Sequence, residues 1–225
     1  MSSDSTAEGS RRELHSLGFN LGAIVLTLAL GGVALAYAID AASRDTDRAP
    51  HRLDTETTLT RTIGGRELEI PLSWFRYAEQ RIEGFAKRID LQLVLPLGLN
   101  GAPRTIELTL LPRSSARPSA SLLDGVYLHM FQTKELSGPH GLVGKPLRAG
   151  DGYDGETVWY DPLSADPFVA KCSAPVAPGA EARCLRAVYL APGIASVYAF
   201  GSDVLTNWRS FDSAMRGRLE QIGVF

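Results

Sequence analysis

Cysteine, histidine and lysine are scarce in this chain of 225 residues. The two cysteines form no CxxC or Cys–His cluster, which argues against structural zinc sites and thioredoxin-type redox motifs. The four lysines leave arginine as the dominant cation, a bias typical of a GC-rich genome. The net charge of −2 provides no global field for nucleic acid, so we expect no nucleic-acid partner.

Sequence motifs for common chemistries are missing as well. The chain has no Walker A motif, no GxGxxG after a strand, no haem-binding CxxCH and no GxSxG nucleophile elbow. His15 and His51 fall in a tail and a linker, His129 is expected on the wet face of a strand, and His140 lies in a Gly-Pro-His-Gly turn. The sequence therefore predicts no catalytic, cofactor-binding or metal-binding residue.

One acidic stretch, DGYDGE, carries Asp151, Asp154 and Glu156. Its spacing does not match the EF-hand pattern, and Asp and Gly at a turn explain it without an ion. An enzyme whose site is assembled from distant residues, among them Asp151, Asp154 or His140, is the alternative to a binding protein.

A long apolar run does stand out near the N-terminus. Leu17–Ile39 holds 23 residues without a charge and would span about 34 Å as a helix, enough to cross a bilayer. We therefore predict a short cytoplasmic tail over residues 1–16, a transmembrane helix over 17–39, a solvated linker over 40–56 and one folded domain over 57–225. GxxxG-type pairs within the run would also allow it to pair with another helix.

Cleavage and orientation of this segment leave alternatives open. Ala34-Leu35-Ala36 fits a signal peptidase site, although the apolar core of a signal peptide is shorter than this run. Arg44, Arg48 and Arg52 follow the run, whereas only two arginines precede it, which favours a cytoplasmic domain by the positive-inside rule. Large domains translocate largely regardless of such charges. We therefore expect a retained anchor in a bacterial inner membrane with the domain in the periplasm.

The domain itself has the pattern of a β-rich fold. Strands are predicted at 59–63, 66–70, 89–95, 106–110, 126–132, 156–160, 168–172, 184–190 and 195–200, the first two joined by a Gly-Gly turn. Residues 74–85 are ambiguous between a short helix and an irregular excursion. Residues 112–121 and 137–155 are predicted loops, the second rich in glycine.

The clearest helix is the last one, over 203–222. Its apolar side chains follow spacings of three and four residues, with Ser202 or Asp203 as the cap and Gly223 just past the end. The short connections favour hairpins over parallel crossovers. The predicted fold class is α+β: a mainly antiparallel sheet with a C-terminal amphipathic helix packed on it.

Cys172 and Cys184 lie near facing ends of two predicted strands that a Pro/Gly/Ala loop joins. A hairpin brings such positions within bridging distance, so we predict a disulfide, which suits an oxidising compartment. A catalytic thiol and a metal pair are the alternatives, but neither has partner residues at the required spacing.

Several short motifs extend across the predicted domain: Ile70-Pro71, Arg76-Tyr77, Glu79-Gln80-Arg81, Asp90-Leu91 and Pro96, then 168–172, Cys184-Leu185-Arg186 and Trp208. In these motifs the chain resembles small single-pass membrane-anchored bacterial envelope proteins that are uncharacterised. The resemblance implies no activity. We expect a non-enzymatic protein that binds another envelope component; a ligand-sensing module is a further alternative.

Overall fold

A computed structural model describes residues 31–32, 57–150, 154–175, 177 and 181–225. The chain divides into two compact units, Met1–Arg52 and Leu53–Phe225, and the fold below is that of the second. The predicted tail and linker lie outside the described residues, as does the predicted membrane span apart from Gly31 and Gly32, which are helical. Within the described part of the chain, no helix has the length and apolar character needed to span a membrane.

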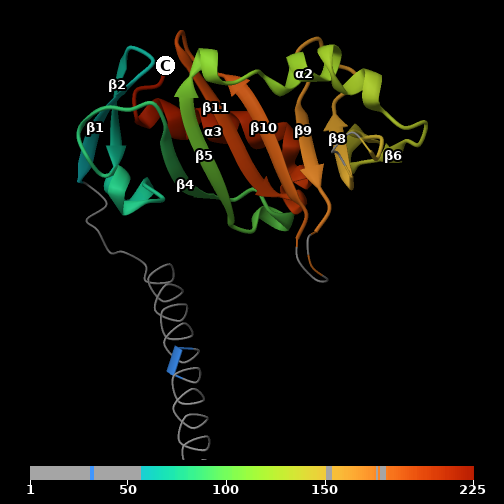
Figure 1. The fold of residues 1–225 in the computed structure, drawn as a ribbon, viewed down its shortest axis with the longest axis horizontal. Coiled ribbons are helices and arrows are strands. Elements are labelled where there is room, and N and C mark those ends of the chain that lie inside the picture. The colour runs from blue at the N-terminus through green and yellow to red at the C-terminus, as the bar shows by residue number, and fades with distance from the viewer. Residues whose placement is uncertain (1–30, 33–56, 151–153, 176, 178–180) are drawn as a thin grey trace, which may run out of the picture. The chain divides into compact units, whose positions relative to one another are not determined.

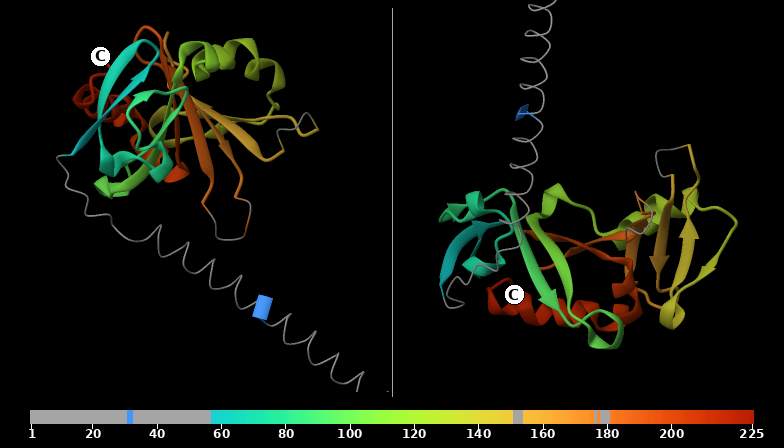
Figure 2. Two further views of the ribbon diagram at one scale, coloured as in Figure 1. Left: turned by 60° about the vertical axis from the view of Figure 1, so that its left-hand side comes forward. Right: turned by 90° about the horizontal axis from the view of Figure 1, so that it is seen from below.

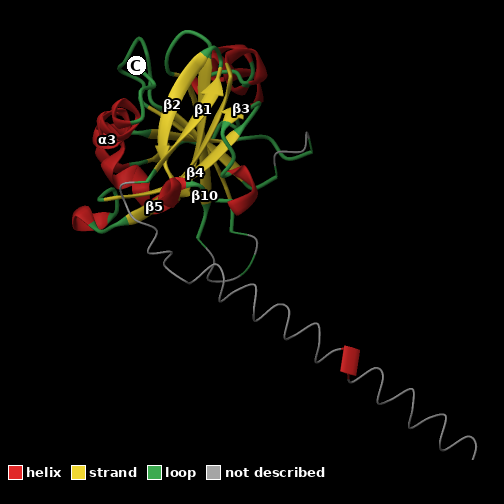
Figure 3. Ribbon diagram, turned by 90° about the vertical axis from the view of Figure 1, so that its left-hand side faces the viewer, coloured by secondary structure: helices red, strands yellow, loops and turns green. Residues whose placement is uncertain are grey.

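The domain begins with a small sheet. β1 (Thr58–Ile63) and β2 (Arg66–Pro71) form the predicted hairpin. Its turn residues Gly64 and Gly65 have φ of 59° and 81°, values that glycine adopts without strain. β3 (Gly84–Phe85) then pairs in parallel with the other edge of β1, so the strand order is β2-β1-β3 (Figure 3).

A second, eight-stranded sheet makes up the rest of the β-structure. Every neighbouring pair in it is antiparallel, and the spatial order is β4-β5-β11-β10-β9-β8-β7-β6 (Figure 1). The first hairpin is followed by a six-strand meander whose last strand returns to pair with β5. The strands are β4 (Ile89–Leu95), β5 (Arg104–Pro112), β6 (Leu136–Ser137), β7 (Val143–Pro146), β8 (Glu156–Tyr160), β9 (Val169–Ser173), β10 (Arg183–Tyr189) and β11 (Ile194–Gly201).

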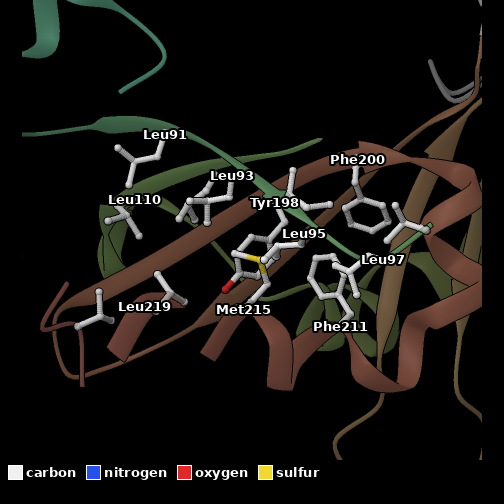
Figure 4. Packing of buried hydrophobic residues seen from close by; sticks show 14 of the residues in the cluster. Leu91, Leu93, Leu95, Leu97, Leu110, Tyr198, Phe200, Phe211, Met215 and Leu219 are labelled. Atoms are coloured by element: carbon white, nitrogen blue, oxygen red, sulfur yellow. The ribbon is translucent and has the colours of Figure 1, made fainter. Parts of the chain in front are cut away.

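The main core lies between this sheet and α3 (Trp208–Gln221). Phe211, Met215 and Leu219 of α3 are at most 1% exposed, and in Figure 4 they point toward the apolar side chains of the strands. Phe211 meets the ring of Tyr198 edge-on at 5.3 Å between centroids. The predicted packing of an amphipathic C-terminal helix on an antiparallel sheet is thus confirmed.

The opposite face of the sheet carries a smaller core. α2 (Ser119–Gly125) and the 3-10 turn η5 (Tyr127–Met130) cover β8 and β9 there, burying Val158 and Val169. Figure 2 shows α2 and α3 on opposite sides of the strands. Toward the middle of the sheet this face is more open, and Leu185 of β10 is 45% exposed.

Three of the predicted segments were wrong. Residues 126–132 form η5 rather than a strand, because Tyr127 is buried against α2 and the backbone turns instead of extending. The predicted loop over 137–155 contains β7 and the end of β6. β7 pairs with both β6 and β8, and this pairing orders a segment whose glycine-rich sequence is typical of a loop. The predicted loop over 112–121 contains the start of α2.

The segments around the first and last helix predictions also differ in detail. Residues 74–85 form the irregular excursion, with 3-10 turns at Leu72–Trp74 and Ala78–Gln80. The α-helical part of the last helix begins at Trp208, after the 3-10 segment η7 (Ser202–Asn207). The residue at the N-cap is Gly201 for η7 and Asn207 for α3, not the predicted Ser202 or Asp203, and the Asp203 carboxylate pairs with Arg104. Gly223 follows the helix with φ of 81°, as predicted.

Candidate functional site

The predicted disulfide is present. Cys172 on β9 and Cys184 on β10 stand directly opposite each other in the strand register and are bonded. Both are buried on the face of the sheet that α3 covers. Closing a loop of this length stabilises the fold by roughly 3 kcal/mol in the chain-entropy model. The two cysteines therefore have a structural role and are not candidate nucleophiles or metal ligands.

The disulfide also forms part of the wall of a cavity of about 550 Å³. This cavity lies where η7 leaves the sheet, beside β8 and β9 and the 3-10 turn η6 (Pro139–Gly141). None of the described residues that line it carries a charge. Its principal side chains are Trp159, Cys172 and Leu205 on the apolar side, with the hydroxyl groups of Thr157, Ser202 and Thr206 among them. We call it the Trp159 cavity.

The indole ring of Trp159 is held in place by two glycines. A Cβ atom at Gly144, the partner of Trp159 across the β7–β8 ladder, would lie 2.6 Å from the ring, and one at Gly138 would lie 2.7 Å from it. Neither glycine has a positive φ, so here the requirement for glycine is space rather than conformation. The aromatic wall of the cavity is consequently preformed by the backbone of the neighbouring strand and turn.

A second hollow, of about 450 Å³, lies at the ends of β5, β10 and β11 and is lined by charged groups. Glu107 forms ion pairs with both Arg76, at 2.5 Å, and Arg183. At the rim, the Asp203 carboxylate lies next to Glu181 and raises the pKa of that carboxyl group, chiefly through a hydrogen bond between the two side chains. Most of the charged side chains that line the hollow are therefore paired with one another, and Glu181 and Asp203 are two carboxyl groups side by side at its rim.

A buried arginine fastens α3 to the sheet. The Arg186 side chain is 8% exposed and donates from Nη2 to Asp212 Oδ2 at 2.7 Å and from Nη1 to the Val169 carbonyl at 3.2 Å. Its guanidinium group also lies 4.4 Å from the ring centre of Phe168. Nearby, burial raises the pKa of Tyr198 to about 12, so this phenol stays neutral at physiological pH. With its donors engaged in this way, Arg186 has a structural role.

The structure describes only part of the enzyme alternative. Asp151 lies outside the described residues, and Asp154 and His140 are exposed. Glu156 accepts hydrogen bonds from Lys171 at 2.7 Å, so its charge is already compensated. His129 is exposed, but on η5 rather than on a strand. Among the described residues, no three His, Cys, Asp or Glu side chains are grouped as metal ligands would be.

No protein-family model, no curated protein and no solved structure matches this chain. The resemblance to membrane-anchored envelope proteins consequently remains a prediction, and the site has to be interpreted from its own geometry. Sequence reasoning missed the Trp159 cavity because its walls come from five separate segments.

Proposed function

We propose that this chain is a membrane-anchored binding protein of the bacterial envelope. In this proposal Leu17–Ile39 is retained in the inner membrane and residues 57–225 lie in the periplasm. The domain binds another envelope component, an uncharged part of which enters the Trp159 cavity. The uncharged apolar run supports the anchor, and the bonded cysteines are what an oxidising compartment favours.

The observation that carries the binding function is the Trp159 cavity. Its volume of about 550 Å³ falls in the range typical of ligand sites, and its lining is mainly apolar with a few hydroxyl groups, which is the usual composition of such sites. Because none of the described lining residues is charged, the cavity offers a charged ligand no ionic partner among them. An uncharged ring or side chain can instead stack on Trp159 and form hydrogen bonds with the hydroxyl groups.

Filling the cavity tests this function. In Thr206→Phe the new ring would occupy the space beside Trp159. The control Thr133→Phe adds the same ring at an exposed position just before β6. We expect a component that co-purifies with the wild-type chain from detergent-solubilised membranes to be lost with Thr206→Phe and retained with Thr133→Phe. Retention with both variants would show that the cavity is not the binding site.

The location has its own test. A reporter that is active only in the periplasm should give a signal when fused after Phe225, and the chain should remain in the membrane after carbonate washing. Signal from a cytoplasm-only reporter would reverse the topology. The arginines that follow the apolar run would then have been the better guide.

An enzyme with a site assembled from distant residues is the second candidate, and the charged hollow favours it. Acid–base catalysis uses carboxyl groups whose pKa is raised, and Glu181 beside Asp203 is such a group. Hydrolysis of an envelope substrate that the wild type performs and Glu181→Gln does not, with the fold unchanged by circular dichroism, would support this candidate over the binding function.

A further inference from the structure

Two large apolar side chains protrude from the edge of the small sheet. Phe85 on β3 is 89% exposed, and Ile82, just before it, is 64% exposed. Their backbone is fixed: the Ala86 amide donates to the Thr62 carbonyl at 2.8 Å, and the buried Arg61 donates to the Ile82 carbonyl. The backbone hydrogen bonds therefore hold the apolar pair in an exposed position, which leaves it available to a partner.

The pair is flanked along the chain by basic residues. Arg81, Lys87 and Arg88 flank it, with Glu83 the single acidic residue between 81 and 88. Arg88 remains 61% exposed although it pairs with Asp90 underneath. We call Arg81, Ile82, Phe85, Lys87 and Arg88 the β3 edge patch. Apolar side chains ringed by basic ones are typical of protein surfaces that lie in the interface of an anionic bilayer.

A comparison within the domain sharpens this interpretation. Leu163, in the turn between β8 and β9, is 91% exposed, but its neighbours are Asp161 and Asp166. Its exposure matches that of Phe85, yet its carboxylate surroundings would be repelled by anionic lipid. Glu67 and Glu69 on β2 likewise lie across the small sheet from β3, which confines a favourable contact to the β3 edge.

The position of the patch relative to the start of the domain adds a second argument. β3 runs parallel to β1, the first strand of the domain, and the register sets Gly84 and Phe85 beside Arg61 and Thr62, so the patch lies within a few residues of the domain's first strand. A chain segment of the length of residues 40–56 spans at most about 60 Å in any conformation. A tether this short holds the domain at a high effective concentration near the bilayer, so even a small contact is populated.

We propose that the β3 edge patch binds the surface of the bilayer in which the chain is anchored. Phe85 and Ile82 insert among the headgroups, and the basic side chains lie on the phosphates of anionic lipids. This inference rests on the anchor of the proposed function and adds that the domain is held against the membrane rather than free on its linker. The face carrying the Trp159 cavity is not part of the contact.

The full-length chain in lipid vesicles provides the test. Because the native cysteines are bonded and buried, a cysteine introduced as Ile82→Cys can be labelled selectively with an environment-sensitive fluorophore. Leu163→Cys is the matched control. In vesicles of phosphatidylcholine with phosphatidylglycerol, we expect spin-labelled lipid to quench the label at 82 several-fold more than the label at 163. Adding Lys87→Glu should remove most of the excess quenching of the label at 82, whereas Lys134→Glu should not.

Each outcome distinguishes the two proposals. A chain that floats with the vesicles after carbonate washing, but whose labels at 82 and 163 are quenched equally, would overturn the patch and leave the anchor intact. A chain that does not float with the vesicles would overturn the anchor, and the patch with it. A blue-shifted label at 82 that lipid does not quench would indicate contact between copies of the chain, which also refutes the bilayer contact.

Discussion

Replacing Gly144 by Ala tests whether the Trp159 ring is positioned by the absence of a side chain on the neighbouring strand. The new Cβ would lie 2.6, 2.8 and 2.9 Å from three carbons of the ring. Unstrained carbon contacts are about 3.5–4.0 Å, so the ring has to move by about 1 Å. Overpacking of this kind costs roughly 1–3 kcal/mol, while the smaller entropy of the unfolded alanine chain offsets about 0.4–1 kcal/mol.

The expected result is a free energy of unfolding lowered by about 1–2 kcal/mol, measured by urea denaturation. The near-ultraviolet circular dichroism of the folded protein should change as well, because the indole shifts. The matched control is Gly217→Ala in the middle of α3, where a Cβ meets no atom within 4 Å. That substitution should raise the free energy of unfolding by about 0.8–1 kcal/mol. A Gly144→Ala variant as stable as the wild type, with an unchanged spectrum, would refute the proposed positioning.

Three further outcomes are expected. Burial opposes ionisation of Asp90, but hydrogen bonds from Arg88, Thr109 and Gln80 outweigh it and lower the pKa. The contribution of Asp90 to stability is therefore present above the unfolded pKa near 3.8 and is lost as the pH falls through the folded pKa. In urea denaturation, Asp90→Asn should be less stable than the wild type at pH 7 by about 1–3 kcal/mol. At the acid end of a pH series the two proteins should be equally stable. Cys172→Ser should cost about 2–4 kcal/mol by the same measurement, and native protein from intact cells should react with alkylating reagents only after reduction; free thiols would refute the bridge in vivo. Asp212→Ala should destabilise more than Arg186→Met, because only the first leaves a buried guanidinium group without its carboxylate; the reverse order in chemical denaturation would contradict that account.

Regular alternation predicted the strands that carry the main core. In β4, Leu91 and Leu93 point to α3 as their spacing indicates, and the facing cysteines came within bridging distance as their strands required. Asp90 illustrates the limit of such patterns. It does lie on the face opposite that core, but it is only 4% exposed, because its cross-strand partner Thr109 bonds to it and Gln80 closes over it from the irregular segment, which strand alternation does not place there.

The Trp159 cavity could not be predicted from the sequence for a similar reason. Its aromatic wall depends on the register that sets Gly144 opposite Trp159, and β7 belongs to a stretch whose glycines are typical of a loop. The sequence feature that could have indicated the cavity is the pair of glycines, Gly138 and Gly144, that precedes a tryptophan in a predicted strand. Glycine in a strand often marks a close approach of another group, but which group approaches is set by tertiary pairing alone.

The return of β11 to β5 determines when this domain can fold. β5 ends at Pro112 and β11 starts at Ile194, so the central ladder of the sheet joins segments separated by about half of the domain. The β4–β5 hairpin must keep the outer edge of β5 unpaired until β11 has been synthesised. The small sheet also depends on the end of the chain, because the Glu69 amide donates to the Ile222 carbonyl. A chain synthesised from its N-terminus would thus pass through a long-lived intermediate with exposed strand edges. Its folding should be slow and sensitive to chaperones that bind unfolded chains.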